Sequence, residues 1–140
     1  MVYENYLKLE FDSNKENVKL ARDTIALFCS KLNPTEDEIY AIKLAVSEAV
    51  TNAIIHGYEN KQGRIIVETN ISNKTIDIKV FDTGTGIENI EKSLEPFYTT
   101  KCENENTGIG FTLIDTYMDS LDIKPNTPTG TIVYMTKTIK

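Results

Sequence analysis

The sequence predicts an α/β (α+β) sandwich, in which helices pack on one face of a mixed, largely antiparallel sheet. Three observations lead to this fold class. Segments with the apolar spacing of helices and segments with the alternation of strands are grouped along the chain. Two strand-like segments in the middle are joined by a short polar turn, and two more strand-like segments end the chain. The strict alternation of strands and helices that indicates a doubly wound parallel sheet is absent. The 140 residues suit one domain, which we expect to span residues 1–140.

The N-terminal part predicts a strand followed by two helices. Alternating apolar residues from Tyr3 to Phe11 indicate the strand. Two pairs with the Ser/Thr-x-x-Glu spacing of a capping box come next, and each predicts a helix start, because hydroxyl and carboxylate satisfy backbone N–H groups that the first turn leaves unpaired. The first helix should end near Leu32, before Asn33-Pro34, and the second at Gly57. The pairs are Ser13 with Glu16 and Thr35 with Glu38.

The rest of the chain predicts a hairpin, two helices and two strands. Two β-rich runs flank Ser72-Asn73-Lys74, and the second of them alternates apolar and polar residues. The segment Pro96–Thr107 has no regular period and predicts a loop, after which Gly108-Ile109-Gly110 opens a helix. The expected elements are strands at Arg64–Ile71 and Thr75–Phe81, a short helix at Asn89–Leu94, a helix through Met118, and strands at Ser120–Lys124 and Thr131–Ile139.

Composition restricts the classes of function. The formal net charge of −6 argues against direct nucleic-acid binding, which needs a basic surface. The two cysteines, Cys29 and Cys102, do not form a disulfide framework or a metal-binding spacing. The N-terminus does not read as a signal peptide, and no apolar run approaches the roughly 18 residues of a membrane span. We therefore expect a cytoplasmic protein without a membrane partner.

A carboxylate and a carboxamide share one face of the second predicted helix. Glu48 and Asn52 are four residues apart, and the residues around them, such as Ala45 and Ala49, are small. Two interpretations stay open. The polar pair could face solvent while the alanines pack in the core, or the alanines could leave room for a ligand that both polar groups contact.

Three glycine-containing segments lie at the ends of predicted elements. In Asp82-Thr83-Gly84-Thr85-Gly86, the glycines let the backbone turn close to a ligand, and the carboxylate can accept a hydrogen bond from an exocyclic amine. Gly108-Ile109-Gly110 opens a helix whose first N–H groups suit a phosphate. Gly130-Thr131 begins the last strand. Taken alone, each segment also fits a structural role: an Asx turn, a flexible helix start and a β-turn.

The order of these motifs resembles the GHKL superfamily of ATPases. Glu-x-x-x-Asn on a helix, Asp-x-Gly-x-Gly after a strand, a variable loop, Gly-x-Gly before a helix and Gly-Thr near the end occur together. Within this superfamily, the chain is similar over essentially its whole length to the sporulation anti-sigma F factors. The runs that carry this similarity are Ser47–Tyr58, Pro96–Lys101 and Thr107–Thr112. The resemblance implies the GHKL (Bergerat) ATP-binding fold.

The resemblance also implies an activity and a set of partners. Members of this family are small serine kinases that hold a sporulation sigma factor inactive and phosphorylate a serine on an anti-anti-sigma antagonist. We therefore expect ATP and Mg²⁺ as cofactors, and a sigma factor, an anti-anti-sigma factor and a second copy of the chain as partners. Arg22 matches an arginine that the family uses toward its partners, although a solvated charge fits a single helical arginine equally well.

Carried onto this sequence, the resemblance implies roles for individual residues. Glu48 would be the general base that takes the proton of the attacking serine hydroxyl. Asn52 would bind Mg²⁺ through its side-chain oxygen. Asp82 would read the adenine amino group, with Thr131 nearby through a water molecule. The other implied nucleotide contacts are Gly84, Gly86, Thr99, Thr100, Lys101, Thr107, Gly108 and Gly110, with the segment 99–107 forming a lid over the phosphates.

One departure from the family pattern keeps an alternative open. A basic residue usually precedes the Ser/Thr-Gly pair of the second glycine box, whereas this chain has Asn106. A missing cation near the terminal phosphate would affect the rate of transfer more than nucleotide binding. The alternative is therefore a nucleotide-binding regulatory module with weak or no kinase activity. A detached histidine-kinase catalytic domain would need a separate phosphoacceptor segment, which we do not find in the sequence.

Overall fold

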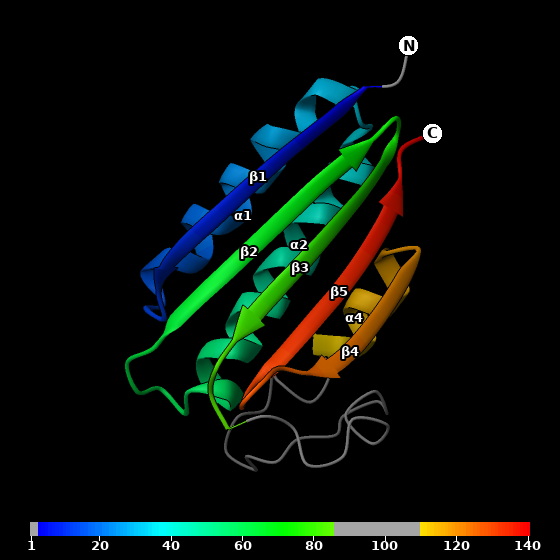
Figure 1. The fold of residues 1–140 in the computed structure, drawn as a ribbon. Helices are drawn as coiled ribbons and strands as arrows, with labels where there is room; N and C mark the ends of the chain where they lie inside the picture. The colour runs from blue at the N-terminus through cyan, green and yellow to red at the C-terminus, as the bar shows by residue number, and fades with distance from the viewer. Residues whose placement is uncertain (1–2, 86–109) are drawn as a thin grey trace.

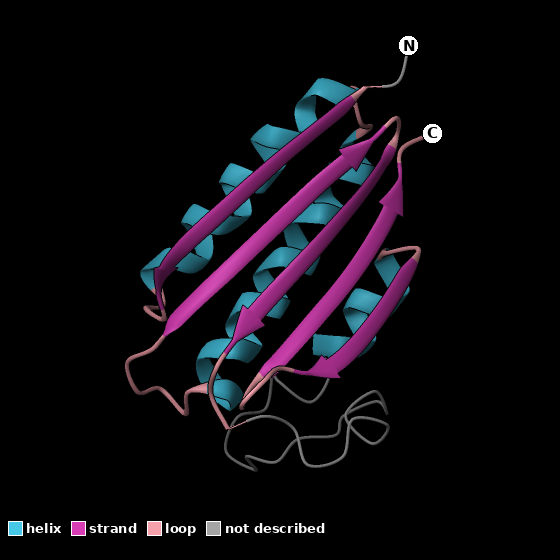
Figure 2. Cartoon of the chain, viewed as in Figure 1, coloured by secondary structure: helices cyan, strands magenta, loops and turns pink. Residues whose placement is uncertain are grey.

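A computed structural model describes residues 3–85 and 110–140 of the chain, and in it helices cover one face of a five-stranded sheet (Figures 1 and 2). The predicted fold class is confirmed. The expected short helix at 89–94 and loop at 96–107 lie outside the described residues. In chain order the elements are β1 (Glu4–Asp12), α1 (Glu16–Cys29), a 3₁₀ turn (Ser30–Leu32), α2 (Glu36–Asn52), a π-helical turn (Ala53–Gly57), β2 (Arg64–Ser72), β3 (Thr75–Asp82), α4 (Gly110–Tyr117), β4 (Ser120–Pro125) and β5 (Thr131–Thr138).

The sheet has the strand order β1-β2-β3-β5-β4, and every neighbouring pair in this order is antiparallel. The expectation of a mixed sheet is thereby corrected for the described strands. The reason lies in the return of the chain after α4. Strand β4 runs in the same direction as β3, but β5 inserts between them and pairs antiparallel with both. This insertion also places the start of β5 beside the end of β3.

The core lies between the sheet and the helices. Along β2 and β3 every second side chain is buried, as the alternating pattern predicts for a sheet with one covered face. The buried positions of α2 recur at helical spacing and face these strands. Within the described ranges, no helix is both long and apolar enough to cross a membrane. The fully buried side chains include Ile25, Ile42, Val46, Val50, Val67, Ile78, Ile114 and Met135.

The two predicted capping boxes have different outcomes. At the start of α2, the Glu38 N–H donates to Thr35 Oγ1 at 3.1 Å and the Thr35 N–H donates to Glu38 Oε1 at 2.9 Å, so this box is confirmed. At α1 the prediction is wrong, because the N-cap residue is Lys15 and no side chain caps the helix. The hydroxyl of Ser13 is engaged elsewhere, since it accepts from the Gly63 N–H and donates to the Lys61 carbonyl.

The C-terminal end of α2 widens into a π-helical turn, Ala53–Gly57. Such turns are rare, and they occur frequently at functional sites. The predicted helix end at Gly57 is confirmed as the last residue of this turn. The widened turn carries the chain from Asn52, the last residue of α2, to Gly57, which lies against Asp82 at the end of β3.

Candidate functional site

The predicted site residues that the structure describes lie at one end of the sheet, the lower end in Figure 1. Asp82 is the last residue of β3, and its register partner in β5 is Thr131, the first residue of that strand. The C-terminal end of α2 and the first residue of α4, Gly110, lie at the same end. Because neighbouring antiparallel strands place the end of one beside the start of the next, the topology brings the Asp82 segment and the Gly130-Thr131 segment together.

Asp82 presents a buried carboxylate. The residue is 4% exposed, and its side chain accepts a hydrogen bond from the Gly84 N–H at 3.0 Å. Burial raises the pKa of this carboxyl to about 6, although the backbone N–H groups of Gly84 and Thr131 act in the opposite direction. A carboxylate in this setting gains from a further hydrogen-bond donor, such as an exocyclic amine.

Close backbone contacts surround this carboxylate. A Cβ on Gly57 would lie 2.9 Å from the Asp82 carboxyl carbon, so a side chain there would displace the acid. A Cβ on Gly84 would overlap the Gly57 carbonyl, and the Thr85 N–H donates to that same carbonyl at 2.8 Å. Gly130 has φ of 108°, and a Cβ on it would overlap the Asp82 carbonyl. Gly84 therefore has a packing requirement of its own, besides the close nucleotide approach that the sequence predicts for it.

Asn52 is the clearest unsatisfied group at this end of the molecule. Asn52 is 5% exposed, yet neither Oδ1 nor Nδ2 of its side chain has a hydrogen-bond partner in the described part of the chain. A buried polar group without a partner costs about 1–3 kcal/mol, so an arrangement of this kind points to a ligand. Side-chain amide oxygens are ligands that Mg²⁺ accepts. The geometry thus fits a cation with oxygen ligands, such as Mg²⁺, at Asn52.

Glu48 lies one helical turn before Asn52 on α2. The residue is half-buried, and this burial raises the pKa of its carboxyl. A raised pKa makes a carboxylate a better proton acceptor near neutral pH, because its affinity for the proton is higher. The pair on this helix therefore combines a group that can accept a proton with a group that can hold a cation.

Helix α4 begins at Gly110 and packs against α2. Its first turn contains a residue that the sequence reasoning did not select. The Thr112 Oγ1 is buried and has no hydrogen-bond partner among the residues that the structure describes. Other predicted contacts lie outside the described residues, so the structure does not place them. These are Gly86, Thr99, Thr100, Lys101, Thr107 and Gly108.

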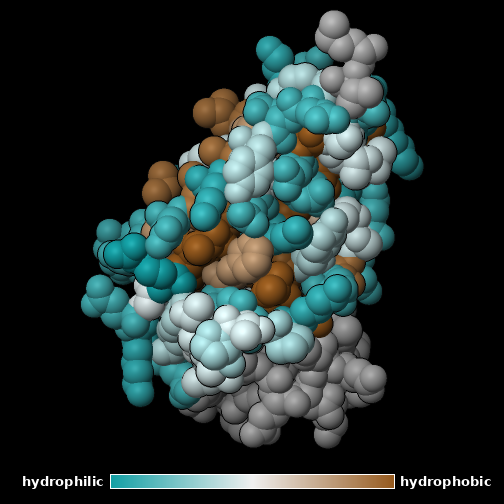
Figure 3. Space-filling model, viewed as in Figure 1, coloured by the Kyte–Doolittle hydropathy of each residue, from teal (hydrophilic) through white to brown (hydrophobic). Residues whose placement is uncertain are grey.

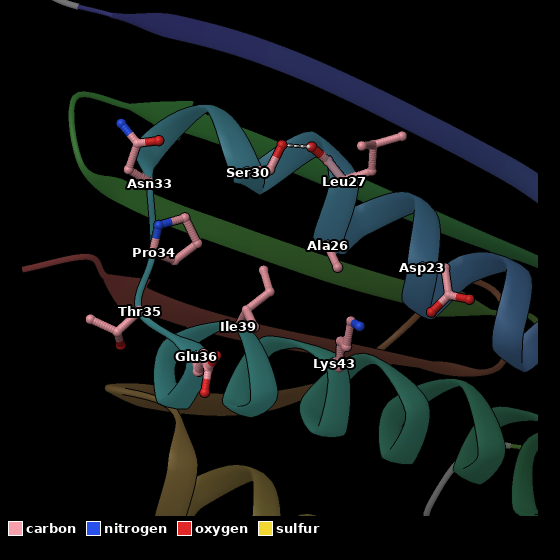
Figure 4. A pocket seen from close by; sticks show the side chains of 10 residues that line it. All are labelled: Asp23, Ala26, Leu27, Ser30, Asn33, Pro34, Thr35, Glu36, Ile39 and Lys43. Atoms are coloured by element: carbon pink, nitrogen blue, oxygen red, sulfur yellow. Dashed lines mark hydrogen bonds between the residues drawn. The ribbon is translucent and has the colours of Figure 1, made fainter.

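A groove of about 440 Å³ lies between α1 and α2, but it is not the candidate site. Figure 4 shows Ala26 of α1 and Ile39 of α2 pointing toward one another inside it. The α2 residues that line the groove extend from Glu36 to Lys43, whereas Asn52 is the last residue of this helix. At 1.5 Å per residue, Lys43 and Asn52 are roughly 14 Å apart along the helix axis.

Two further residues beside the site had no assigned role in the sequence analysis. Tyr58, which follows the π-helical turn, donates its hydroxyl hydrogen to the Arg64 carbonyl and accepts from the Thr83 N–H. The Asn126 side chain donates to the Asp82 carbonyl at 2.9 Å. The contacts of Tyr58 with Thr83 and of Asn126 with Asp82 have no local sequence signal, because the partners are 25 and 44 residues apart.

Arg22 lies on α1 and forms an ion pair with its neighbour Asp23, at 2.8 Å between Nε and Oδ1. Its side chain is about one third exposed, so the pair sits at the surface. Such pairs contribute little to stability. Both interpretations of Arg22, as a partner contact or as a solvated charge, therefore remain predictions.

Comparison with known proteins adds an independent line of evidence. Residues 11–137 match a family model described as a histidine kinase-like ATPase domain. The anti-sigma F factor of Thermoanaerobacter sp. (strain X514) is 50% identical over 139 residues, covering 99% of this chain and 97% of that protein. The anti-sigma F factor of Clostridium kluyveri (strain ATCC 8527) is 47% identical over 136 residues, covering 97% of this chain and 96% of the relative.

Solved structures agree in fold. The RsbU and RsbW domains of Rv1364c from Mycobacterium tuberculosis give a TM-score of 0.68 at 17% identity, over 96% of this chain and 32% of that chain. The catalytic domain of histidine kinase ThkA gives 0.60 at 21% identity, over 95% and 96%. At these identities the likeness concerns the fold alone. From the family model and the near full-length relatives, we conclude that the chain belongs to the anti-sigma F factors, within the histidine kinase-like ATPase (GHKL) superfamily.

Proposed function

We propose that this chain binds ATP with Mg²⁺, inhibits a sporulation sigma factor of the F type, and acts as a serine kinase on an anti-anti-sigma antagonist in the cytoplasm. The observation that carries the proposal is the buried amide of Asn52, which has no hydrogen-bond partner among the described residues, at the end of the sheet where Asp82 presents a carboxylate. The names of relatives at 47–50% identity support the sigma-factor part.

In the proposed site, each described residue binds one part of the nucleotide. Asp82 accepts a hydrogen bond from the adenine amino group, and Thr131 contributes through a water molecule. Asn52 ligates Mg²⁺ through Oδ1, and the start of α4 at Gly110 directs backbone N–H groups toward phosphate. Gly84 lets the loop after β3 approach the base. From the undescribed segment, the proposal includes Gly86, Thr99, Thr100, Lys101, Thr107 and Gly108.

For phosphoryl transfer, ATP supplies the phosphoryl group and Mg²⁺ offsets its negative charge. The contribution of the protein is chiefly positioning, because this chemistry needs little covalent participation. Glu48 takes the proton of the attacking serine hydroxyl, and the raised pKa of its half-buried carboxyl suits that task. Asn52 holds the metal one turn away on the same helix, so the base and the cation keep a fixed relation.

The proposal includes a homodimer that pairs through the open face of the sheet. Side chains on this face alternate with the buried ones, and Figure 3 shows apolar surface in its middle. One row across the strands carries the half-buried residues Ile66, Phe81 and Ile132. Glu10 continues this row on β1, and Lys124 continues it on β4. An apolar centre with opposite charges at its two ends suits a second copy of the same surface.

One experiment tests the kinase and separates it from the alternative. The protein is incubated with labelled ATP and an anti-anti-sigma protein, and both ATP affinity and phosphate on the antagonist are measured. A serine kinase binds ATP and transfers phosphate. A regulatory module with weak or no kinase activity binds ATP but leaves the antagonist unlabelled. In that second case, Asn106→Arg should restore transfer if the missing cation is the cause. Failure to bind ATP would contradict the proposal as a whole.

A further inference from the structure

We propose that Tyr58 is a positioning residue of the nucleotide site, because its hydroxyl fixes the loop that directly follows Asp82. This inference deepens the proposed nucleotide-binding function and rests on it. Tyr58 lies directly after the π-helical turn, and the loop Thr83–Thr85 lies directly after β3. The hydroxyl therefore connects two segments that are far apart in the sequence and that both border the buried carboxylate.

The hydroxyl of Tyr58 uses its full hydrogen-bonding capacity. It donates to the Arg64 carbonyl at the start of β2, and it accepts from the Thr83 N–H at 2.8 Å. The Thr83 Oγ1 lies 3.1 Å away and is placed to donate to the remaining lone pair. The ring packs against Gly63, where a Cβ would overlap it. With the ring fixed in this way, the hydroxyl is a rigid anchor rather than a mobile contact.

The loop is held from a second side by the connection between β4 and β5. The Thr129 hydroxyl donates to the Thr83 carbonyl at 3.0 Å, and the Asn126 amide donates to the Asp82 carbonyl at 2.9 Å. Thr83 therefore has its N–H bound by Tyr58 and its carbonyl bound by Thr129. Because Thr83 follows Asp82 directly, these bonds restrict the backbone from which the carboxylate projects.

These bonds lie at the surface and hold a short loop, so their main expected effect is on binding. Thr83 is exposed, and it follows the last residue of β3. Without the tyrosine hydroxyl, the loop would be less restricted in the free protein, and nucleotide binding would have to order it. A hydrogen bond of this kind typically changes an affinity by on the order of 3- to 10-fold. The loss should concern adenine recognition, because the loop directly follows Asp82, the residue proposed to bind the adenine amino group.

The test compares Tyr58→Phe with Tyr6→Phe. The control also removes one bonded tyrosine hydroxyl, which donates to Glu68 at 2.6 Å on the open face of the sheet. Binding of MgADP and MgGDP is measured by titration calorimetry. We expect Tyr58→Phe to bind MgADP on the order of 3- to 10-fold more weakly and to bind MgGDP as the wild type does, so that the preference for adenine falls. Tyr6→Phe should match the wild type with both nucleotides. Wild-type affinity and preference in Tyr58→Phe would overturn the inference.

Hydrogen exchange separates this inference from the proposed function. In the nucleotide-free protein, Tyr58→Phe should speed the exchange of the Thr83 amide hydrogen, and Tyr6→Phe should not. Unchanged exchange at Thr83 would refute the anchor whether or not the protein binds nucleotide. Absence of nucleotide binding by the wild type would instead refute the proposed function. Should Tyr58→Phe fail to fold, Thr129→Val removes the other bond to Thr83 and is expected to lower the MgADP affinity and the adenine preference in the same direction.

Discussion

Asp82 combines a proposed binding role with an unfavourable position for a charge. Its folded-state pKa of about 6 lies above the ordinary value of 3.8, because burial disfavours the ionised form. The folded state therefore binds a proton more tightly than the unfolded state does. The stability contributed by this group is fully present below pH 3.8 and is lost as the pH rises through about 6.

This sign leads to a prediction for Asp82→Asn. Between pH 4.5 and pH 7.5, the wild type should lose roughly 2 kcal/mol of unfolding free energy relative to the variant, which has no carboxyl to ionise. The measurement is urea unfolding of both proteins at the two pH values. At pH 7.5 the variant should also bind ATP more weakly, because it lacks the charge that the adenine amino group contacts. If the unfolding free energies of the two proteins depend on pH equally, burial of the Asp82 charge does not cause the pH dependence.

Glu48 and Asn52 should differ in kind when they are mutated. Glu48→Gln keeps nearly the same volume but cannot accept the serine proton, so it should slow phosphotransfer by ~10²–10⁴-fold and leave ATP binding and sigma inhibition intact. Asn52→Ala removes the proposed metal ligand and should weaken ATP binding itself. Sigma inhibition and phosphotransfer to the antagonist should therefore both be lost. Measuring ATP affinity, sigma binding and antagonist phosphorylation side by side separates the two cases. A fully active Glu48→Gln enzyme would contradict the base assignment.

At the scale of single elements, the start of α2 illustrates a local interaction with a measurable effect. Thr35→Ala removes the hydroxyl that accepts from the Glu38 N–H, and we expect it to lower the unfolding free energy by about 1 kcal/mol. Ser30→Ala is the matched control, because its hydroxyl bonds the Leu27 carbonyl at an exposed helix end. The control should stay within about 0.5 kcal/mol of the wild type. Equal effects of the two substitutions would argue against the capping box as the cause.

The same elements explain how far the sequence could predict the structure. The box at Thr35 was predictable because both of its partners lie within one helical turn. The box at Ser13 was not, because Gly63, 50 residues away, engages the same hydroxyl. Local spacing identifies groups that could pair, whereas tertiary contacts decide which of the possible partners they take.

The candidate site divides in the same way. Asp82 was predictable from its place after an alternating strand, and Asn52 from its spacing to Glu48 on a helix with small neighbours. Tyr58 was not, because its contact with Thr83 depends on how the π-helical turn packs beside the end of β3. Asn126 was not, because its contact with Asp82 depends on how β5 inserts between β3 and β4. That insertion also made the sheet antiparallel where a mixed one was expected. No local period of the chain encodes the order of strands in the sheet.

At the scale of the whole molecule, the open face of the sheet has a charge pattern that fits pairing with itself. Across one row, Glu10 and Lys124 lie at opposite ends, and in the next row Lys8 and Asp122 do so with the signs reversed. A twofold axis parallel to the strands would place β1 of one copy over β4 of the other. In both rows, each acidic end would then meet a basic end of the other copy. Ile66 of one copy would face Ile132 of the other.

This geometry predicts that the protein is a dimer and that Ile66→Lys makes it a monomer, because the substitution would place a charged side chain in the apolar centre of the proposed interface. Leu27→Lys is the matched control. It introduces the same charge at a residue that is 74% exposed, on α1, behind the opposite face of the sheet. Size-exclusion chromatography with light scattering, at micromolar concentration, measures the mass of each protein. A monomeric wild type would refute the dimer. If the wild type and Ile66→Lys are both dimers, the protein dimerises through another surface. If Leu27→Lys is a monomer, the interface lies on the helical face.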